Sequence, residues 1–315
     1  MVAAAGAVLV PTLVVTDVNP LSPAVHCADR AYRVPLSSDP GYITEILRIA
    51  RHERAHLVVP TIDDELTAFA CATPRFAAAG IRVAVSRPST TALCNDKLAL
   101  CRLLRQRGVA AAATWRPAQV PPGTSMPLFV KPNVGRGSVG AFPIRSPREL
   151  DFFTDYVEDA IVQEYLDGPE FTLDMLCSFT GEPLAIVPRE RVVIRAGVID
   201  RGRTVKDDAL LALARQCAAV LPFAGPVNIQ CRVVQGRPVV FEINPRFSGG
   251  IGLTIAAGVD VPRLLLDLVR GERVPPALGQ FKEKLWMTNY EASVFVEERD
   301  VHLDALRPSP IAEVA

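Results

Sequence analysis

The order of strands and helices changes partway along the chain, at a proline-rich connection between residues 117 and 127. Before this connection, short apolar segments alternate with helical patterns, and strands joined by helices are typical of a parallel sheet covered on both faces. After it, strand-like segments follow one another with few helices, as in antiparallel hairpins. The sequence therefore predicts an α/β domain followed by an α+β region.

Charge and cysteine content restrict the partners of such a chain. Its 315 residues include 34 basic and 34 acidic side chains, so it has no general attraction for nucleic acid or an anionic membrane surface. The apolar start, residues 1–15, lacks a basic flank and is too short to span a membrane. Seven cysteines without a CxxC pair are typical of a reduced protein. We expect a cytoplasmic protein that acts on small molecules, with no nucleic-acid or membrane partner.

A glycine-rich segment, residues 131–140, directly follows an apolar strand. Its glycines match the spacing of the dinucleotide-binding fingerprint, but that motif needs a helix to begin there, and the next residues are interrupted by Pro143. A flexible hairpin that folds over phosphates suits the segment better, with backbone N–H groups around Gly137 and the Ser138 hydroxyl as donors. An ordinary glycine-rich hairpin explains this segment alone equally well.

Lysine usage favours the phosphate interpretation. The chain has only five lysines among its 34 basic residues, yet two of them stand at well-defined positions. Lys131 ends the strand before the glycine-rich segment, and Lys97 begins a helix, where the helix dipole disfavours a cation. Lysine supplies a compact charge for phosphate oxygens. For either residue considered alone, a surface salt bridge would be the usual role.

A second pattern is a turn, Asp167–Pro169, between two predicted strands. Alternation places Glu170, Thr172 and Asp174 on one face of the second strand, opposite an apolar face. The polar outer face of an ordinary hairpin is the simpler interpretation of this pattern by itself.

The strongest pattern is a pair of strands around a short polar turn at residues 235–237. A three-residue loop would pair Val234 with Pro238 and place Gln230 opposite Glu242. Alternation predicts the shared faces, which are Asn228, Gln230 and Arg232 on the first strand and Val240, Glu242 and Asn244 on the second.

The polar side chains of these two strands favour a metal ion. Gln230, Glu242 and Asn244 offer amide and carboxylate oxygens, the hard ligands that Mg²⁺ prefers, and Mg²⁺ completes its shell with waters and nucleotide phosphates. Arg246 follows closely and is placed to hold an anion beside the metal. A solvent-facing polar stripe is the alternative, but it does not explain why the intervening positions are so purely apolar.

Taken in this order, the motifs resemble the ATP-grasp superfamily, most closely its carbamoyl-phosphate-synthase-like branch. The resemblance covers about residues 16–275 and is most specific at 225–230 and 242–250. It implies a parallel-sheet pre-ATP-grasp domain, truncated at its start, followed by a two-lobed ATP-grasp fold. The implied divisions are the pre-ATP-grasp domain at 1–92, the ATP-grasp domain at 93–275 with a mobile nucleotide lid at about 115–185, and a C-terminal extension at 276–315, in which Ala292–Glu297 is the one predicted strand.

The resemblance also implies a role for each matching residue, with ATP and Mg²⁺ or Mn²⁺ as ligands. Glu170 would bind the ribose hydroxyls, and Arg246 and Lys131 would act on the reacting groups. The other implied contacts are Lys97, Lys131, Gly137 and Ser138 with the ATP phosphates, Glu164, Tyr165 and Leu166 with the adenine edge, and Gln230, Glu242 and Asn244 with the metal.

The implied reaction joins a small-molecule carboxylate to an amine through an acyl phosphate and releases ADP and phosphate. The alternative is a catalytically degenerate ATP-binding subunit of an assembly, because the usual opening strand and glycine-rich loop are missing or are rebuilt from Ala7–Pro11. Gly249 stands where carbamoyl-phosphate synthases have an arginine, which argues against bicarbonate as the substrate and predicts room for a larger acid. The family also allows a homodimer.

A basic segment at residues 189–195 supplies the candidate residues for binding the acid substrate. Arg189, Arg191 and Arg195 alternate along an extended segment that lies near the acyl-phosphate site in the family fold. We hypothesise that one or more of them bind the substrate carboxylate. A solvated basic edge strand is nearly as good an explanation.

Overall fold

The computed structural model describes residues 11–298 and residue 301. The chain divides into two compact units, residues 1–55 with 290–315 and residues 56–289, and each is described by itself. The predicted boundary at residues 92/93 lies inside the second of these units. The segment Ala7–Pro11, from which the sequence analysis expected a rebuilt first element, lies outside the described residues apart from Pro11.

The first unit contains a parallel pair of strands and two helices. Glu53, which follows the last helix, binds Tyr32 and Arg30 of the second strand and so fixes the end of the helix to the sheet. Residues 292–297 form no strand, contrary to the prediction. The elements are β1 (Val14–Asp17), α1 (Pro23–Cys27), β2 (Arg30–Arg33) and α2 (Tyr42–His52).

The second unit begins with another parallel pair whose strands are connected by a long helix. The Glu65 carboxylate accepts hydrogen bonds from the backbone N–H groups of Thr61 (2.7 Å) and Ile62 (3.1 Å), which starts this helix with Asp63 and Asp64 in its first turn. The elements are β3 (Leu57–Val58), α3 (Asp63–Ala77), β4 (Arg82–Val83), α4 (Pro88–Asn95) and α5 (Lys97–Gln106).

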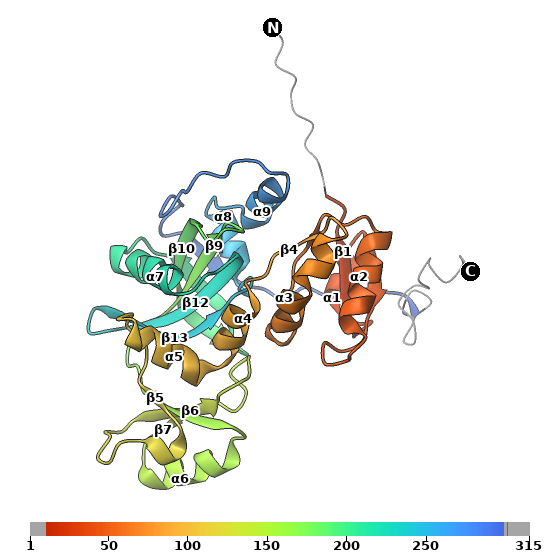
Figure 1. Cartoon of the computed structure of the whole chain (residues 1–315). Helices are drawn as coiled ribbons and strands as arrows, with labels where there is room; N and C mark the ends of the chain where they lie inside the picture. The colour runs from red at the N-terminus through yellow and green to blue at the C-terminus, as the bar shows by residue number, and fades with distance from the viewer. Residues whose placement is uncertain (1–10, 299–300, 302–315) are drawn as a thin grey trace. The chain divides into compact units, whose positions relative to one another are not determined.

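A six-stranded antiparallel sheet forms the largest layer of this unit, in the order β13-β12-β9-β10-β11-β14 (Figure 1). Helices α5 and α7 pack on one face around Leu104, Leu213 and Ile229, and α9 packs on the other face against Leu176. The elements are β9 (Glu170–Cys177), β10 (Pro183–Arg195), β11 (Val198–Thr204), α7 (Asp208–Val220), β12 (Gly225–Val234), β13 (Arg237–Asn244), α8 (Ile251–Ala256), α9 (Val261–Val269) and β14 (Trp286–Thr288).

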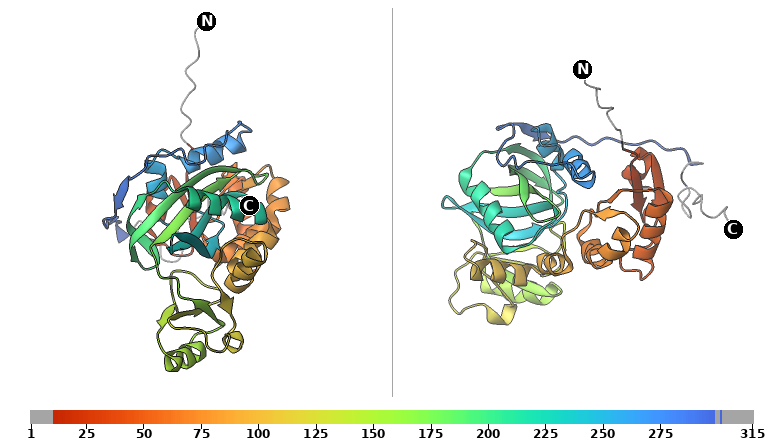
Figure 2. Two further views of the ribbon diagram at one scale, coloured as in Figure 1. Left: turned by 90° about the vertical axis from the view of Figure 1, so that its left-hand side faces the viewer. Right: turned by 45° about the horizontal axis from the view of Figure 1, so that its top comes forward.

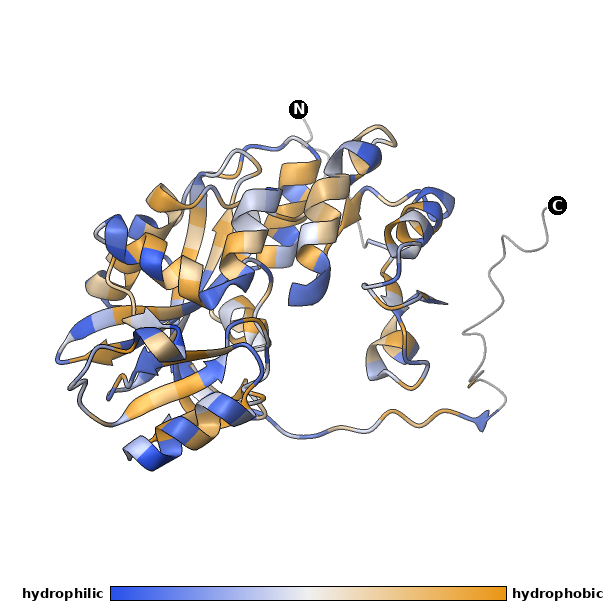
Figure 3. Ribbon diagram, turned by 60° about the horizontal axis from the view of Figure 1, so that its bottom comes forward, coloured by the Kyte–Doolittle hydropathy of each residue, from blue (hydrophilic) through white to orange (hydrophobic). Residues whose placement is uncertain are grey.

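A smaller four-stranded sheet, in the order β5-β8-β6-β7, forms a separate lobe with α6 (Figure 2). In both sheets apolar residues recur along the strands, whereas α6 alternates hydrophilic and hydrophobic positions (Figure 3). The lobe ends near residue 164 and not near 185, because β9 and β10 pair into the larger sheet. Its elements are β5 (Thr114–Trp115), the 3-10 turn η1 (Pro117–Gln119), β6 (Leu128–Pro132), β7 (Phe142–Ile144), α6 (Pro147–Tyr156) and β8 (Ala160–Glu164).

The β12–β13 hairpin corrects one prediction and confirms another. Val234 pairs with Arg237, so the loop has two residues, Gln235 and Gly236, with φ of 49° and 77°. Positive φ at both positions is what a type I′ turn requires. An irregularity in the register near Phe241 then shifts the pairing by one residue, so that Gln230 does pair with Glu242.

These elements confirm the predicted fold class, an α/β domain followed by a two-lobed α+β region. Within the described part of the chain, no helix combines the length and the apolar character needed to cross a bilayer.

Candidate functional site

A cavity of about 710 Å³ is lined by residues of the four-stranded and the six-stranded sheets of the second unit. A volume of this size is in the usual range for small-molecule and cofactor sites. All the predicted nucleotide and metal residues line it, as do Arg246, Arg189 and Arg191, whereas Arg195 does not.

Two buried lysines lie on the side of the cavity formed by the glycine-rich segment. The ammonium group of Lys97 donates to the carbonyl oxygens of Gly135 (2.7 Å) and Asn133 (3.4 Å). Lys131 is 6% exposed and donates to the carbonyl oxygen of Phe241 at 3.4 Å. Burial lowers the pKa of Lys131, and the nearby Glu242 carboxylate opposes part of this effect. The helix start at Lys97 and the strand end at Lys131 therefore bring both charges to one place.

A β-bulge gives Phe241 a position that strict alternation does not predict. Cys231 pairs with Val240 and Gln230 pairs with Glu242, so Phe241 has no partner of its own in the ladder. Its side chain lines the cavity, with the ring centroid 5.3 Å from Nζ of Lys131, and its carbonyl oxygen accepts from Lys131. Val240, predicted to share the face of Glu242, is instead fully buried in the core. Bulges of this kind redirect side chains beside functional sites.

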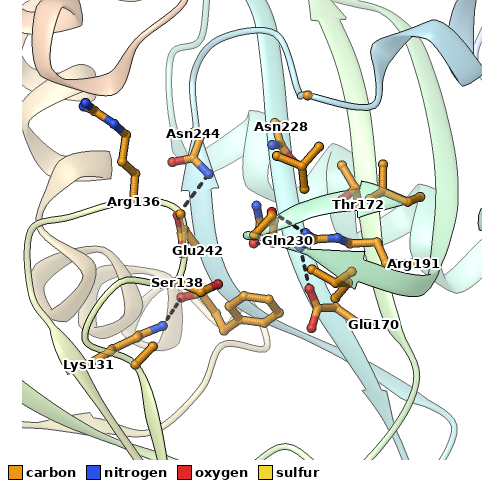
Figure 4. A pocket seen from close by; sticks show the side chains of 18 of the residues that line it. Lys131, Arg136, Ser138, Glu170, Thr172, Arg191, Asn228, Gln230, Glu242 and Asn244 are labelled. Carbon is orange, nitrogen blue, oxygen red and sulfur yellow. Dashed lines mark hydrogen bonds and ion pairs between the residues drawn. The ribbon is translucent and has the colours of Figure 1, made fainter. Parts of the chain in front are cut away.

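The three predicted metal ligands lie together on neighbouring strands (Figure 4). Gln230 on β12 pairs with Glu242 on β13, and Nδ2 of Asn244 donates to Oε1 of Glu242 at 3.1 Å. Asn228 joins them from β12, opposite Asn244, and was not predicted as a ligand. Its Oδ1 is buried without a hydrogen-bond partner among the described residues. A buried acceptor of this kind normally has a partner, so the site is suited to a cation or a donor at that point.

The chemistry of this set fits Mg²⁺. The donors are one carboxylate and three amide side chains, all hard oxygen ligands, and they leave part of the coordination shell to water and phosphate. In the described part of the chain, no group of three or more His, Cys, Asp or Glu side chains is placed to hold a metal. A softer metal held by protein side chains alone has no comparable site there.

The predicted adenine and ribose residues lie at another part of the cavity wall. The Glu164 carboxylate accepts the N–H of Ala113 at 2.8 Å, and Tyr165 and Leu166 follow on the same wall. Glu170 is held by two arginines, Arg191 at 2.5 Å and Arg232 at 2.7 Å. A ribose hydroxyl at Glu170 would therefore share its carboxylate with these guanidinium groups.

Arg246 has a partner that the sequence did not reveal. Its guanidinium group forms hydrogen bonds with both carboxylate oxygens of Asp63, the shortest at 2.7 Å. The neighbouring Asp64 binds Arg136 of the glycine-rich segment. The consecutive acidic residues 63–65 are visible in the sequence. Only the fold brings the first two of them beside Arg246 and Arg136, which are distant along the chain.

The three candidate substrate arginines are separated by the structure. Arg189 is 1% exposed and forms a bidentate pair with Asp174 at 2.7 and 3.0 Å. Arg191 binds Glu170 and also donates to the carbonyl oxygen of Gly197 at 2.6 Å. Arg195 is exposed and faces Asp200 at 3.5 Å. Register shifts in β10 beyond Arg191 break the alternation that had placed all three on one face.

Two family models match the chain. Residues 156–292 match a family described as ATP-grasp in the biosynthetic pathway with Ter operon, and residues 6–84 match the PylC-like N-terminal domain. Among curated proteins, the carbamoyl phosphate synthase large chain of Thermoanaerobacter sp. (strain X514) is 27% identical over 199 residues, which are 56% of this chain and 18% of that protein. The chain spans less than half the length of the first curated relatives it matches, 44% and 18%.

Solved structures share the fold at low sequence identity. Biotin carboxylase from Campylobacter jejuni, in a complex with a β,γ-ATP compound, superposes with a TM-score of 0.69 at 14% identity and covers 87% of this chain and 68% of that one. The L-amino acid ligase from Bacillus licheniformis gives a TM-score of 0.61 at 21% identity, covering 77% and 63%.

The fold, the cavity and these matches agree with one another. They confirm the predicted resemblance to the ATP-grasp superfamily. The matches place a PylC-like N-terminal domain before an ATP-grasp domain and confirm the predicted resemblance to carbamoyl phosphate synthases.

Proposed function

We propose that this chain is an ATP-dependent carboxylate–amine ligase that forms an amide through an acyl phosphate. One observation carries the proposal: two buried lysines, a glycine-rich segment and the group Gln230, Glu242 and Asn244 line the same cavity. A phosphate-binding side therefore adjoins a set of hard oxygen ligands, as transfer of a phosphoryl group requires. The likeness to an L-amino acid ligase supports carboxylate activation as the reaction class.

In the first step, a carboxylate oxygen of the acid attacks the γ-phosphorus of ATP, the bond to the β-phosphate oxygen breaks, and ADP leaves. The amine then attacks the acyl carbon, phosphate leaves, and the amine loses a proton to solvent. Charge neutralisation and positioning dominate such a reaction, because the transferred group spreads its negative charge over its oxygens. Lys97, Lys131 and the N–H groups of the glycine-rich segment would supply fixed positive charge and donors.

Arg246 and the metal ligands act at the transferred group in this proposal. Mg²⁺ or Mn²⁺ held by Gln230, Glu242 and Asn244 would neutralise phosphate oxygens. Arg246 would hold the acyl phosphate, with its guanidinium group oriented by Asp63. The carboxylate and amine are small molecules, we expect the protein to act in the cytoplasm, and the family resemblance allows a homodimer.

The test is ATP-dependent release of ADP and phosphate with panels of acids and amines, together with mass spectrometry of the condensation products. We expect Glu242→Ala to abolish release and chelation by EDTA to do the same. Glu190→Gln is the matched control, because Glu190 lies on the same sheet but pairs with Arg203 outside the cavity lining. Binding of ATP without any turnover would instead favour a degenerate nucleotide-binding subunit.

A further inference from the structure

We infer that the acid substrate is a monocarboxylate with an aliphatic body, which contacts Ile194 and Val198 of the β10–β11 hairpin. This inference rests on the proposed function, since it concerns the acid that the ligase would activate. Ile194 and Val198 line the cavity and have no nucleotide or metal role in that function.

Val198 lies beside the segment that follows Arg246. A Cβ atom built on Gly249 would be 2.9 Å from Cγ1 of Val198, so this side chain occupies the space next to Gly249. The expectation that Gly249 itself leaves free room is therefore corrected: an arginine at position 249 would collide with Val198. Val198 therefore packs against the segment that follows Arg246, the residue that would hold the acyl phosphate in the proposed function.

Three aliphatic side chains line the cavity and yet remain exposed. Ile194 and Val198 on the hairpin are 40% and 45% exposed, and Val139 on the glycine-rich segment is 78% exposed. Exposed apolar groups that line a cavity mark a place where a ligand buries apolar surface. Burial of such side chains by a ligand stabilises the complex.

Three arginines that line the cavity already have acidic partners. Arg246 pairs with Asp63, Arg189 with Asp174, and Arg191 with Glu170. Nη1 of Arg189 is buried without a hydrogen-bond partner among the described residues, and it lies 2.5 Å from the position of a Cβ built on Gly250, so it packs closely against the backbone there. A second carboxylate on the substrate would lose its hydration without gaining an unpaired cation from these three arginines, which is costly.

The hairpin is held in place over the cavity by backbone contacts. A Cβ built on Gly197 would lie 2.8 Å from the Cα atom of Gly137, so the turn of the hairpin touches the glycine-rich segment directly. Arg191 also donates to the carbonyl oxygen of Gly197 at 2.6 Å. The aliphatic side chains are therefore presented by a fixed turn, which favours selection among acids by shape and polarity.

The experiment compares acids of equal length that differ only at the far end: pentanoate with glutarate, and norvaline with glutamate. ATP and hydroxylamine are supplied, because hydroxylamine traps an acyl phosphate as a hydroxamate whatever the natural amine is. We expect the monocarboxylates to exceed the dicarboxylates in kcat/KM by roughly tenfold or more. Val198→Thr, which keeps the shape and replaces one methyl group by a hydroxyl, should lower kcat/KM for the aliphatic acids by roughly tenfold and leave the KM for ATP unchanged.

Val192→Thr is the matched control, since Val192 is 47% exposed on the same hairpin but lies outside the cavity lining. A preference for dicarboxylates, or equal effects of the two threonine variants, would overturn the inference while leaving the ligase proposal in place. If no acid of either kind yields a hydroxamate although ATP binds, both the ligase proposal and this inference fail.

Discussion

Asp63 and Arg246 form a bidentate ion pair between residues 183 positions apart in the sequence, with a shortest distance of 2.7 Å. Asp63 belongs to the first turn of α3, whereas Arg246 follows β13 at the cavity. Both side chains are mostly buried, at 11% and 16% exposed. The pair therefore restricts the direction of the one guanidinium group that we assign to the reacting phosphoryl or acyl group.

Loss of this pair should impair turnover more than nucleotide binding. We expect Asp63→Ala to lower kcat roughly 10- to 100-fold, because small misplacements of a catalytic group carry costs of this size. Asp63→Glu should recover part of the loss. The measurements are kcat, the KM for ATP and thermal stability for each variant. A loss of ATP affinity equal to the loss of kcat would show that Asp63 supports the fold of the site and not the orientation of Arg246.

A substitution of Asn228 should change metal binding without changing the stability of the fold. Its Oδ1 is buried and has no partner among the described residues. Asn228→Leu, a change of similar volume, should alter the free energy of unfolding by less than about 1 kcal/mol, since no hydrogen bond to this oxygen is lost. The same variant should need several-fold more Mg²⁺ for half-maximal turnover. Unchanged Mg²⁺ dependence, measured by titration at saturating ATP, would remove Asn228 from the metal site.

The sequence predicted the fold class and the polar residues that meet in the cavity, but it placed β9 and β10 in the smaller lobe and missed the details that come from irregular backbone. Alternation identified Gln230, Glu242 and Asn244 correctly as neighbours, although the predicted loop was one residue too long. The bulge near Phe241 shifts the register by one residue and so restores the predicted pairing of Gln230 with Glu242. No residue pattern in the sequence predicts this bulge. The same kind of irregularity in β10 separated Arg195 from Arg191. The partner of Arg246 was hidden for another reason: an ion pair across 183 residues depends on the fold and not on local pattern.

Gly197 should be sensitive to substitution because it touches Gly137. Gly197 has φ of 75°, and a Cβ there would lie 2.8 Å from the Gly137 backbone. Gly197→Ala should therefore displace the glycine-rich segment and weaken ATP binding several-fold. Gly236→Ala is the control, since Gly236 has φ of 77° but nothing within 4 Å of an added Cβ. Both variants should lose about 1 kcal/mol of stability from backbone strain. Equal ATP affinities, measured by calorimetry, would contradict the proposed contact.

The thiols provide a test of the core. Five of the seven cysteines are buried, and only Cys27 and Cys71 are exposed. Burial raises the pKa of Cys177 and of Cys217 to about 12, so neither forms a thiolate at neutral pH. We expect an aromatic disulfide reagent to label two thiols rapidly in the folded protein and all seven after denaturation. Rapid labelling of a third thiol in the native state would place one of the buried cysteines nearer the surface than the structure does.

The buried ammonium group of Lys131 predicts how nucleotide affinity depends on pH. Burial lowers its pKa below the ordinary lysine value, with partial opposition from Glu242. An amine with a lowered pKa carries its charge fully only below that pKa, so its contribution to ATP binding is complete at lower pH and is lost as pH rises through the lowered value.

Lys131→Arg keeps its charge across this range. In calorimetric titrations from about pH 7 to about pH 10, the affinity for ATP should therefore fall with pH in the parent protein and fall less in Lys131→Arg. Lys206→Arg is the matched control, since Lys206 stacks on Phe281 and lies outside the cavity lining. Parallel pH profiles for the parent and Lys131→Arg would show that Lys131 does not carry the charge that binds the nucleotide.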